Sequence, residues 1–148
     1  MSRNTPQIAK DVRRLRADIQ AVVRSFALFH KRVIGEELIK QARRVHDAVV
    51  WYWDQPGQRL RWSEQLVHAV DLLKEDLQVA KEDAAFPKGF AQFERLYRQA
   101  EAVGAQAGAI RREQRKKHPK GQDARGDQRP SAARPETEYP RRPAGAYP

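Results

Sequence analysis

The sequence predicts an all-α protein: an antiparallel four-helix bundle followed by a disordered, basic C-terminal tail. Apolar residues recur at spacings of three and four in four separate stretches, which is typical of amphipathic helices. No alternating β pattern interrupts them, and the short connections favour antiparallel neighbours in one bundle. We expect the bundle within residues 1–114 and the tail within residues 115–148, where apolar residues become scarce.

The first helix is expected to follow Thr5-Pro6, where Thr5 suits an N-cap and Pro6 the first helical position. Its opposite face is mostly basic. After Phe26 the stripe is lost, so we expect the first helix to end there and the chain to turn into the second. The apolar stripe contains Ile8, Val12, Leu15, Ile19, Val22, Val23 and Phe26.

The second helix is expected over residues 33–53, and the rest of the bundle is organised around it. A helix with one apolar side must bury that side, and its aromatic end requires large neighbours. The helix should end at Asp54, because Pro56-Gly57 is a turn signal. Its stripe contains Ile34, Leu38, Ala42, Val45, Val49 and Trp53, widened by Ile39 and Tyr52.

The third helix is expected to start near Ser63, a suitable N-cap, and to carry its stripe to Ala80. The fourth should run from Phe90 to about Glu113. Its second half is rich in small residues, which permit close helix packing, and packing within one subunit is favoured over packing between subunits. The small residues of interest are Gly104, Ala107 and Gly108.

Composition restricts the classes of function. The 148-residue chain has a formal net charge of +10, which favours an anionic partner such as nucleic acid, and it contains no cysteine. Disulfides and thiolate metal sites are therefore excluded. No apolar run approaches the roughly 20 residues that cross a bilayer, and the N-terminus lacks the apolar segment of a signal peptide. We expect a cytoplasmic protein without a membrane partner.

No enzyme signature is visible, so we expect no catalytic residues, no metal and no cofactor. His46 and His68 fall in helical segments without the HExxH or ExxH spacing of metal sites. We interpret His46 as an ordinary, partly exposed residue. Neither a glycine-rich phosphate loop nor a nucleophile beside a base is present.

The basic residues of the first two helices and the bend between them are the predicted nucleic-acid-binding residues. Phosphate binding requires many cations along a surface rather than one exact site. A solvated face with scattered basic residues is an equally acceptable interpretation. Three tryptophans, Trp51, Trp53 and Trp62, could stack on bases, although packing is the commoner role. The predicted binding residues are Arg13, Arg16, Arg24, Lys31, Arg32, Lys40, Arg43 and Arg44.

An ordered set of short motifs resembles a known family over roughly residues 12–112. These motifs are His30-Lys31-Arg32 with Gly35, then Glu36-Glu37-Leu38, Asp71-Leu72-Leu73-Lys74, Phe93 with Leu96, and the small-residue run Ala102–Ile110. The family is a group of four-helix bundles that contains the accessory variability determinant (Avd) of diversity-generating retroelements and proteins encoded in 23S rRNA intervening sequences. Where its last helix often has Gly-Trp, this chain has Gly108-Ala109.

The resemblance implies a basic, non-enzymatic bundle that assembles into a homo-oligomeric, pentameric barrel. It also implies binding to a reverse transcriptase and to its template RNA and cDNA, in support of mutagenic reverse transcription. The strong positive charge favours the Avd branch. The alternative is a structural scaffold of the intervening-sequence type that binds protein only, and an enzyme with an unrecognised site is a third possibility.

Overall fold

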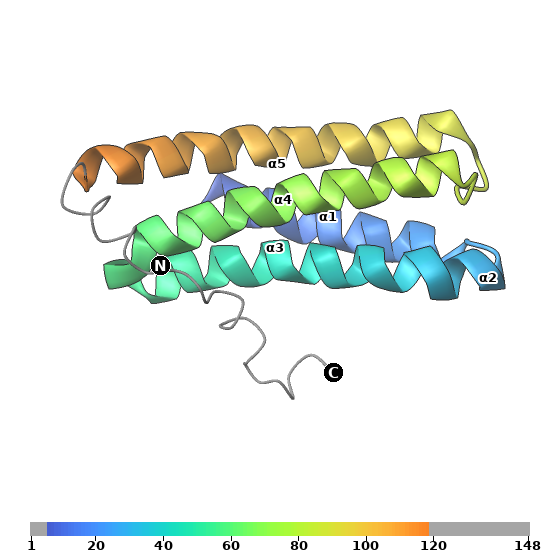
Figure 1. The fold of residues 1–148 in the computed structure, drawn as a ribbon, viewed down its shortest axis with the longest axis horizontal. Helices are drawn as coiled ribbons and strands as arrows, with labels where there is room; N and C mark the ends of the chain where they lie inside the picture. Colours follow the sequence, from blue (N-terminus) through green and yellow to red (C-terminus); the bar gives the residue numbers. More distant parts are fainter. Residues whose placement is uncertain (1–5, 119–148) are drawn as a thin grey trace. The chain divides into compact units, whose positions relative to one another are not determined.

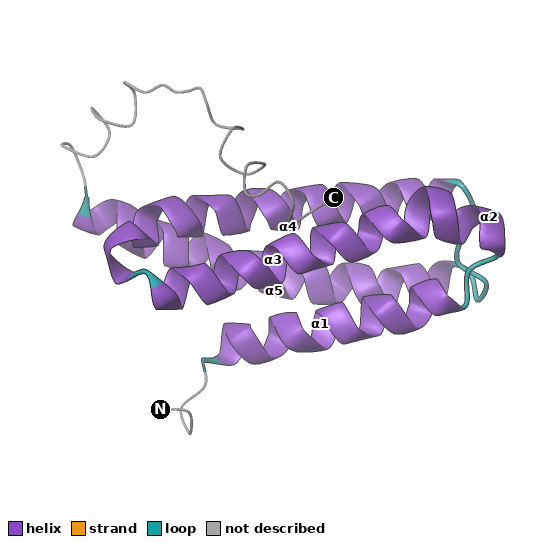
Figure 2. Cartoon of the chain, turned by 90° about the horizontal axis from the view of Figure 1, so that it is seen from below, coloured by secondary structure: helices purple, strands orange, loops and turns teal. Residues whose placement is uncertain are grey.

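The computed structural model describes residues 6–118, and over that range the prediction of an all-helical protein is confirmed. Figures 1 and 2 show the long helices lying side by side as a bundle. The bundle belongs to the first of two compact units, Met1–Glu113, and the second unit is Gln114–Pro148. The elements are α1 (Gln7–Arg24), α2 (Leu28–His30), the π-helical turn η2 (Lys31–Gly35), α3 (Glu36–Asp54), the 3-10 turn η3 (Pro56–Gln58), α4 (Arg59–Glu82) and α5 (Phe90–Lys117).

Helix α1 lies beside both α3 and α5, and α4 lies beside the same two helices. Two side-chain hydrogen bonds join α1 to α5. Gln99 Nε2 donates to Asp18 Oδ2 over 2.9 Å, and Gln106 Nε2 donates to Asp11 Oδ2 over 2.8 Å. Between these two pairs the residue numbers rise along α5 while they fall along α1.

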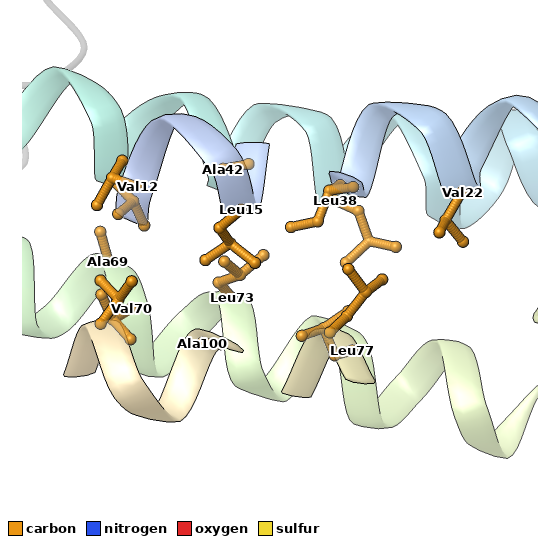
Figure 3. Packing of buried hydrophobic residues seen from close by; sticks show 14 of the residues in the cluster. Val12, Leu15, Val22, Leu38, Ala42, Ala69, Val70, Leu73, Leu77 and Ala100 are labelled. Atoms are coloured by element: carbon orange, nitrogen blue, oxygen red, sulfur yellow. The ribbon is translucent and has the colours of Figure 1, made fainter. Parts of the chain in front are cut away.

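The core is a single apolar cluster to which all four long helices contribute. Leu15, Leu38, Leu73 and Leu77 are almost completely shielded from solvent and occupy its middle (Figure 3). Smaller side chains such as Ala100 let the helices approach one another between these leucines. Burying each leucine contributes roughly 1.5–3 kcal/mol of transfer free energy. The predicted apolar stripes therefore do meet in one core.

The start of α1 differs from the prediction at one residue. Pro6 has φ −60° and ψ 147°, which is extended rather than helical, so α1 begins at Gln7 and Pro6 precedes it. Thr5, the predicted N-cap, lies outside the described residues. The helix ends at Arg24, and Phe26 remains buried although it follows the helix, because its ring packs edge-on against Phe86 at a centroid distance of 5.5 Å.

The helical segment that contains α3 begins earlier than the predicted residue 33. It starts with α2 at Leu28 and continues through the π-helical turn η2 into α3. Gly35 ends this turn, and a Cβ atom on it would lie 2.6 Å from Val23 Cγ1 of α1. That close approach explains a glycine here. The end of α3 also corrects the predicted stripe, since Tyr52 is 6% exposed whereas Trp53 is 39% exposed. After Val49 the next core residue is therefore Tyr52, three residues on, and not Trp53, four residues on.

Helix α4 begins at Arg59, four residues before the predicted N-cap Ser63. Ser63 is fully buried inside the helix, and its Oγ donates to Leu60 O over 2.8 Å. It is therefore a helix-interior serine that bonds back to the preceding turn, not a cap.

Helix α5 begins at Phe90 as predicted and continues to Lys117, so residues 115–117 are helical rather than part of a disordered tail. The remaining tail, residues 119–148, lies outside the described residues. In the small-residue half of α5, a Cβ on Gly104 would lie 3.3 Å from Val70 Cγ1, whereas one on Gly108 would only approach the flexible end of Arg112 at 3.7 Å. Gly104 therefore serves close packing against α4 within the chain.

Candidate nucleic-acid interface

The line of contact between α1 and α3, called here the α1–α3 seam, is marked by a hydrogen bond between Arg16 and His46. Arg16 Nη1 and His46 Nδ1 lie 2.7 Å apart. Because a guanidinium can only donate, His46 Nδ1 must accept, so the imidazole is neutral and carries its proton on Nε2. The contact positions the Arg16 side chain without neutralising its charge.

Three neighbours and partial burial set the protonation of His46. Burial lowers the pKa of His46 below its usual 6.5, the positive charges of Arg16 and Arg13 lower it further, and Asp47 acts in the opposite direction. Both arginines are thus close enough to His46 to affect its charge. The sequence interpretation of His46 as an ordinary residue missed this contact, because its partner lies 30 residues away along the chain.

Two basic residues of α1 lie on the side that faces α3. Arg13 and Arg16 are three residues apart and thus neighbours on the helix surface, and both influence His46. The two acids of this helix, Asp11 and Asp18, both bond to glutamines of α5 instead. The two acids of α1 therefore face α5, whereas Arg13 and Arg16 lie toward the α1–α3 seam.

On α3, the residues on the same stripe as His46 recur at helical spacings. Arg43, His46, Val50 and Trp53 are separated by three, four and three residues, so they form one stripe along the helix. Arg43 is exposed, and it precedes His46 by one turn. Arg13 and Arg16 therefore lie at the seam beside His46, and helical spacing puts Arg43 on the same stripe of α3 as that histidine.

Arg44 lies on a different side of α3. Its charge acts on Asp76 of α4. The pKa of this carboxyl is raised to about 6, first by burial and then by the negative charges of Glu37 and Glu75, while Arg44 opposes the rise. Asp76 Oδ2 is buried and accepts no hydrogen bond within the described part of the chain. Arg44 thus belongs to the contact between α3 and α4, apart from the seam.

The remaining predicted binding residues lie nearer to α2 and η2, the bend between α1 and α3. Arg24 is the last residue of α1 and is exposed, as are Arg32 in η2 and Lys40 in α3, whereas Lys31 is half-buried. These cations extend along the bundle toward α2 and are not gathered around His46. The eight predicted residues accordingly divide into a seam group, a bend group and Arg44.

Two arginines at the start of α4 are functional candidates that the sequence interpretation did not include. The guanidinium of Arg59 lies 5.0 Å from the ring centroid of Trp53, and that of Arg61 lies 5.1 Å from the ring centroid of Trp62. Cations at this distance from an indole ring are attracted by its negative face. The signal available in the sequence was the run of aromatic residues ending at Trp53, followed six residues later by Arg59.

An exposed apolar patch lies at the other end of the bundle, near α2. Leu28, Phe29 and Val33 are 63%, 70% and 56% exposed, and Phe90 is 61% exposed at the start of α5. Figure 1 places α2 and the connection between α4 and α5 at the same end of the bundle. Large apolar side chains exposed at one end of a bundle provide surface for protein–protein contacts.

Among residues 6–118, no three or more His, Asp or Glu side chains gather in a way that could hold a metal ion. Over the same part of the chain, none of the helices combines the length and the apolar character needed to cross a bilayer.

Comparison with known proteins adds no identification. No protein-family model, no curated protein and no solved structure matches this chain. Its function must therefore be inferred from the fold, the seam and the surface chemistry.

Proposed function

We propose that this chain is a non-enzymatic accessory protein of a diversity-generating retroelement. It binds the reverse transcriptase together with template RNA and cDNA, and it supports mutagenic reverse transcription. The observation that carries the nucleic-acid part is the α1–α3 seam, where Arg16 and Arg13 lie near a neutral His46 and Arg43 precedes that histidine by one turn of α3. Cations concentrated along one surface attract a phosphate backbone, and they release its counterions on binding.

The proposed architecture is an antiparallel four-helix bundle that assembles with further copies into a pentameric barrel. The two hydrogen bonds between α1 and α5 support an antiparallel arrangement, because from one bond to the next the residue number rises on α5 and falls on α1. Exposed apolar side chains at Leu28 and Phe29 supply surface for self-association.

Charge reversal at the seam tests the proposal. The double variant Arg13→Glu with Arg43→Glu should lower affinity for a template-like RNA by about tenfold or more, because it replaces two phosphate contacts by repulsion. A matched control, Lys88→Glu with Arg112→Glu, changes the net charge equally at exposed positions away from the seam. Mobility shift at fixed salt measures both. Equal losses in the two variants would contradict a localised seam, and no loss in either would contradict the function.

The partner enzyme gives a second test. A reverse transcriptase gene and a pair of near-identical repeats are expected beside the gene for this chain, and the encoded polymerase should co-purify with it. A polymerase that fails to co-purify with the full chain would contradict the accessory role.

The second candidate is a structural scaffold that binds only protein, favoured by the exposed apolar patch at Leu28, Phe29, Val33 and Phe90. Under this function the positive charge serves solubility. The seam variant Arg13→Glu with Arg43→Glu distinguishes the two candidates. In a scaffold it leaves the affinity for the protein partner unchanged, whereas in an RNA-binding protein it lowers the affinity for RNA.

A further inference from the structure

The end of α3 presents an indole on the same side as the α1–α3 seam. Trp53 is 39% exposed, and it follows His46 by seven residues, two turns along the stripe that begins at Arg43. The rise over seven helical residues is about 10 Å. A strand held by the seam arginines therefore reaches Trp53 within a few nucleotides.

The neighbours of Trp53 fix its position. Its ring lies edge-on to the buried ring of Tyr52, at a centroid distance of 5.0 Å and an interplanar angle of 87°. The Arg59 guanidinium lies 5.0 Å from the Trp53 centroid and 5.1 Å from the Tyr52 centroid. Arg59 Nε also donates to Tyr52 O over 3.1 Å, which anchors the guanidinium beside the indole.

Neither the core nor Arg59 accounts for the exposed part of this indole. Tyr52 fills the apolar position at the end of α3, so Trp53 is not required for the core. A large aromatic surface left in contact with water is a common feature of recognition sites. An arginine beside it adds a cation that donates hydrogen bonds to a phosphate. An aromatic ring with an adjacent cation is the combination that holds unpaired nucleotides.

We propose that Trp53 and Arg59 form a stacking subsite for one unpaired base of a single-stranded RNA or cDNA. The base stacks on the indole of Trp53, Arg59 contacts the adjoining phosphate, and the strand continues along the seam past His46 to Arg43. The inference rests on the proposed function for the identity of the ligand, and it deepens that function by specifying the form of the strand. A duplex keeps its bases paired and cannot use this subsite.

Trp51 provides a matched control on the same helix. It is 41% exposed, nearly the same as Trp53, but it lies two residues away and therefore on another side of α3. There its ring stacks on Trp62 at a centroid distance of 6.1 Å and an interplanar angle of 26°. Loss of Trp51 removes a similar exposed area without touching the seam.

The test compares an unstructured single-stranded RNA with a duplex of the same length, using the full chain. Trp53→Ala should weaken single-strand binding about 5- to 150-fold, the range for loss of one stacked base, and leave duplex binding unchanged. Trp53→Phe should retain most of the affinity, and Trp51→Ala should change it less than twofold. Equal losses for Trp51→Ala and Trp53→Ala, or no loss for Trp53→Ala, would overturn the subsite.

A spectroscopic readout protects the test against effects on folding. In the variant Trp51→Phe with Trp62→Phe, Trp53 is the remaining tryptophan, and its fluorescence should be quenched by single-stranded RNA and not by duplex RNA. Unchanged fluorescence at saturating single strand would overturn the proposal. Light scattering of Trp53→Ala should give the wild-type mass, and dissociation into smaller species would assign Trp53 to a contact between copies instead.

Failure of this inference and failure of the proposed function give different results. A chain that binds neither form of RNA contradicts both. A chain that binds both forms with the same affinity, whether or not Trp53 is present, retains the seam function and contradicts only the stacking subsite.

Discussion

Arg16 on α1 donates to the neutral imidazole of His46 on α3 over 2.7 Å, and this contact joins the two helices that carry most of the predicted binding residues. Because Arg16 is a permanent cation, protonating His46 would place two positive charges against each other. The seam is therefore built to keep one histidine uncharged among arginines, and its stability should depend on pH.

The first prediction concerns acidification. The pKa of His46 is lowered in the folded protein by burial and by Arg16, so the unfolded chain binds the proton more readily. The stability contributed by the contact is complete above pH 6.5 and is lost as the pH falls from 6.5 through the folded pKa. His46→Gln, which retains an acceptor but does not titrate there, should remove this dependence. His68→Gln, at an exposed position on α4, should not.

Thermal unfolding between pH 7.5 and 5.5 measures this effect. The Asp76→Asn substitution should be present in the reference chain and in both histidine variants. Asp76 titrates in the same pH range as His46, and its titration changes the stability in the opposite direction. Identical pH profiles for His46→Gln and His68→Gln would contradict the contact.

The second prediction concerns the half-buried carboxyl of Asp76. Burial and Glu37 raise its pKa to about 6, so its ionised form destabilises the fold above pH 6, and the penalty fades as the pH falls through 6 toward 3.8. Asp76→Asn should raise the free energy of unfolding at pH 7.5 by about 1 kcal/mol, a value already reduced for solvent screening. Denaturant unfolding should show the gain at pH 7.5 and little gain at pH 4. Asp71→Asn, exposed on the same helix, should show neither.

The third prediction tests the core. Leu73 is fully buried between the helices, as Figure 3 shows, whereas Leu72 beside it is 36% exposed. Leu73→Ala should lower the free energy of unfolding by about 3 kcal/mol, since it leaves a cavity. Leu72→Ala should cost less than about 1 kcal/mol. Similar costs at the two positions, measured by denaturant unfolding, would mean that α4 does not present this face to the core.

The fourth prediction compares two glycines. Gly35→Ala should destabilise by about 1–3 kcal/mol, because its Cβ would lie 2.6 Å from the stiff side chain of Val23. Gly108→Ala should stabilise by up to about 1 kcal/mol through helix propensity, since only the flexible end of Arg112 is near. Thermal unfolding and light scattering should be recorded together. A Gly108→Ala chain that loses its oligomeric state would place this glycine between copies rather than on an open surface.

The sequence predicted the stripes well because helical periodicity directly reflects burial. Ile34, Leu38, Val45 and Val49 all lie in the core as predicted. The pattern failed at the end of α3, where both a three- and a four-residue step from Val49 reach an aromatic residue. Only the packing of the other helices selects between the two.

The helix boundaries were harder to predict for a related reason. Ser63 has the residue type of an N-cap, but Leu60 one turn earlier is half-buried and extends α4 backwards. The need for glycine at position 35 comes from the approach of Val23 from α1, which no local pattern encodes.

The candidate interface was predictable in composition and not in arrangement. The basic residues of α1 and α3 were visible in the sequence, but their division between the seam and Asp76 depends on which helices are neighbours. The contact between Arg16 and His46, and that between Arg59 and Trp53, join residues whose proximity follows from the fold. Charge alone could not distinguish Arg43 from Arg44.

The salt dependence of RNA binding tests the central claim most directly. If the seam cations hold a phosphate backbone, the logarithm of the association constant for a single strand should fall linearly with the logarithm of salt concentration, by about 0.7 for each neutralised phosphate. The Arg13→Glu and Arg43→Glu double variant should have a shallower slope than the Lys88→Glu and Arg112→Glu control. An affinity that stays flat from low to moderate salt would contradict the account.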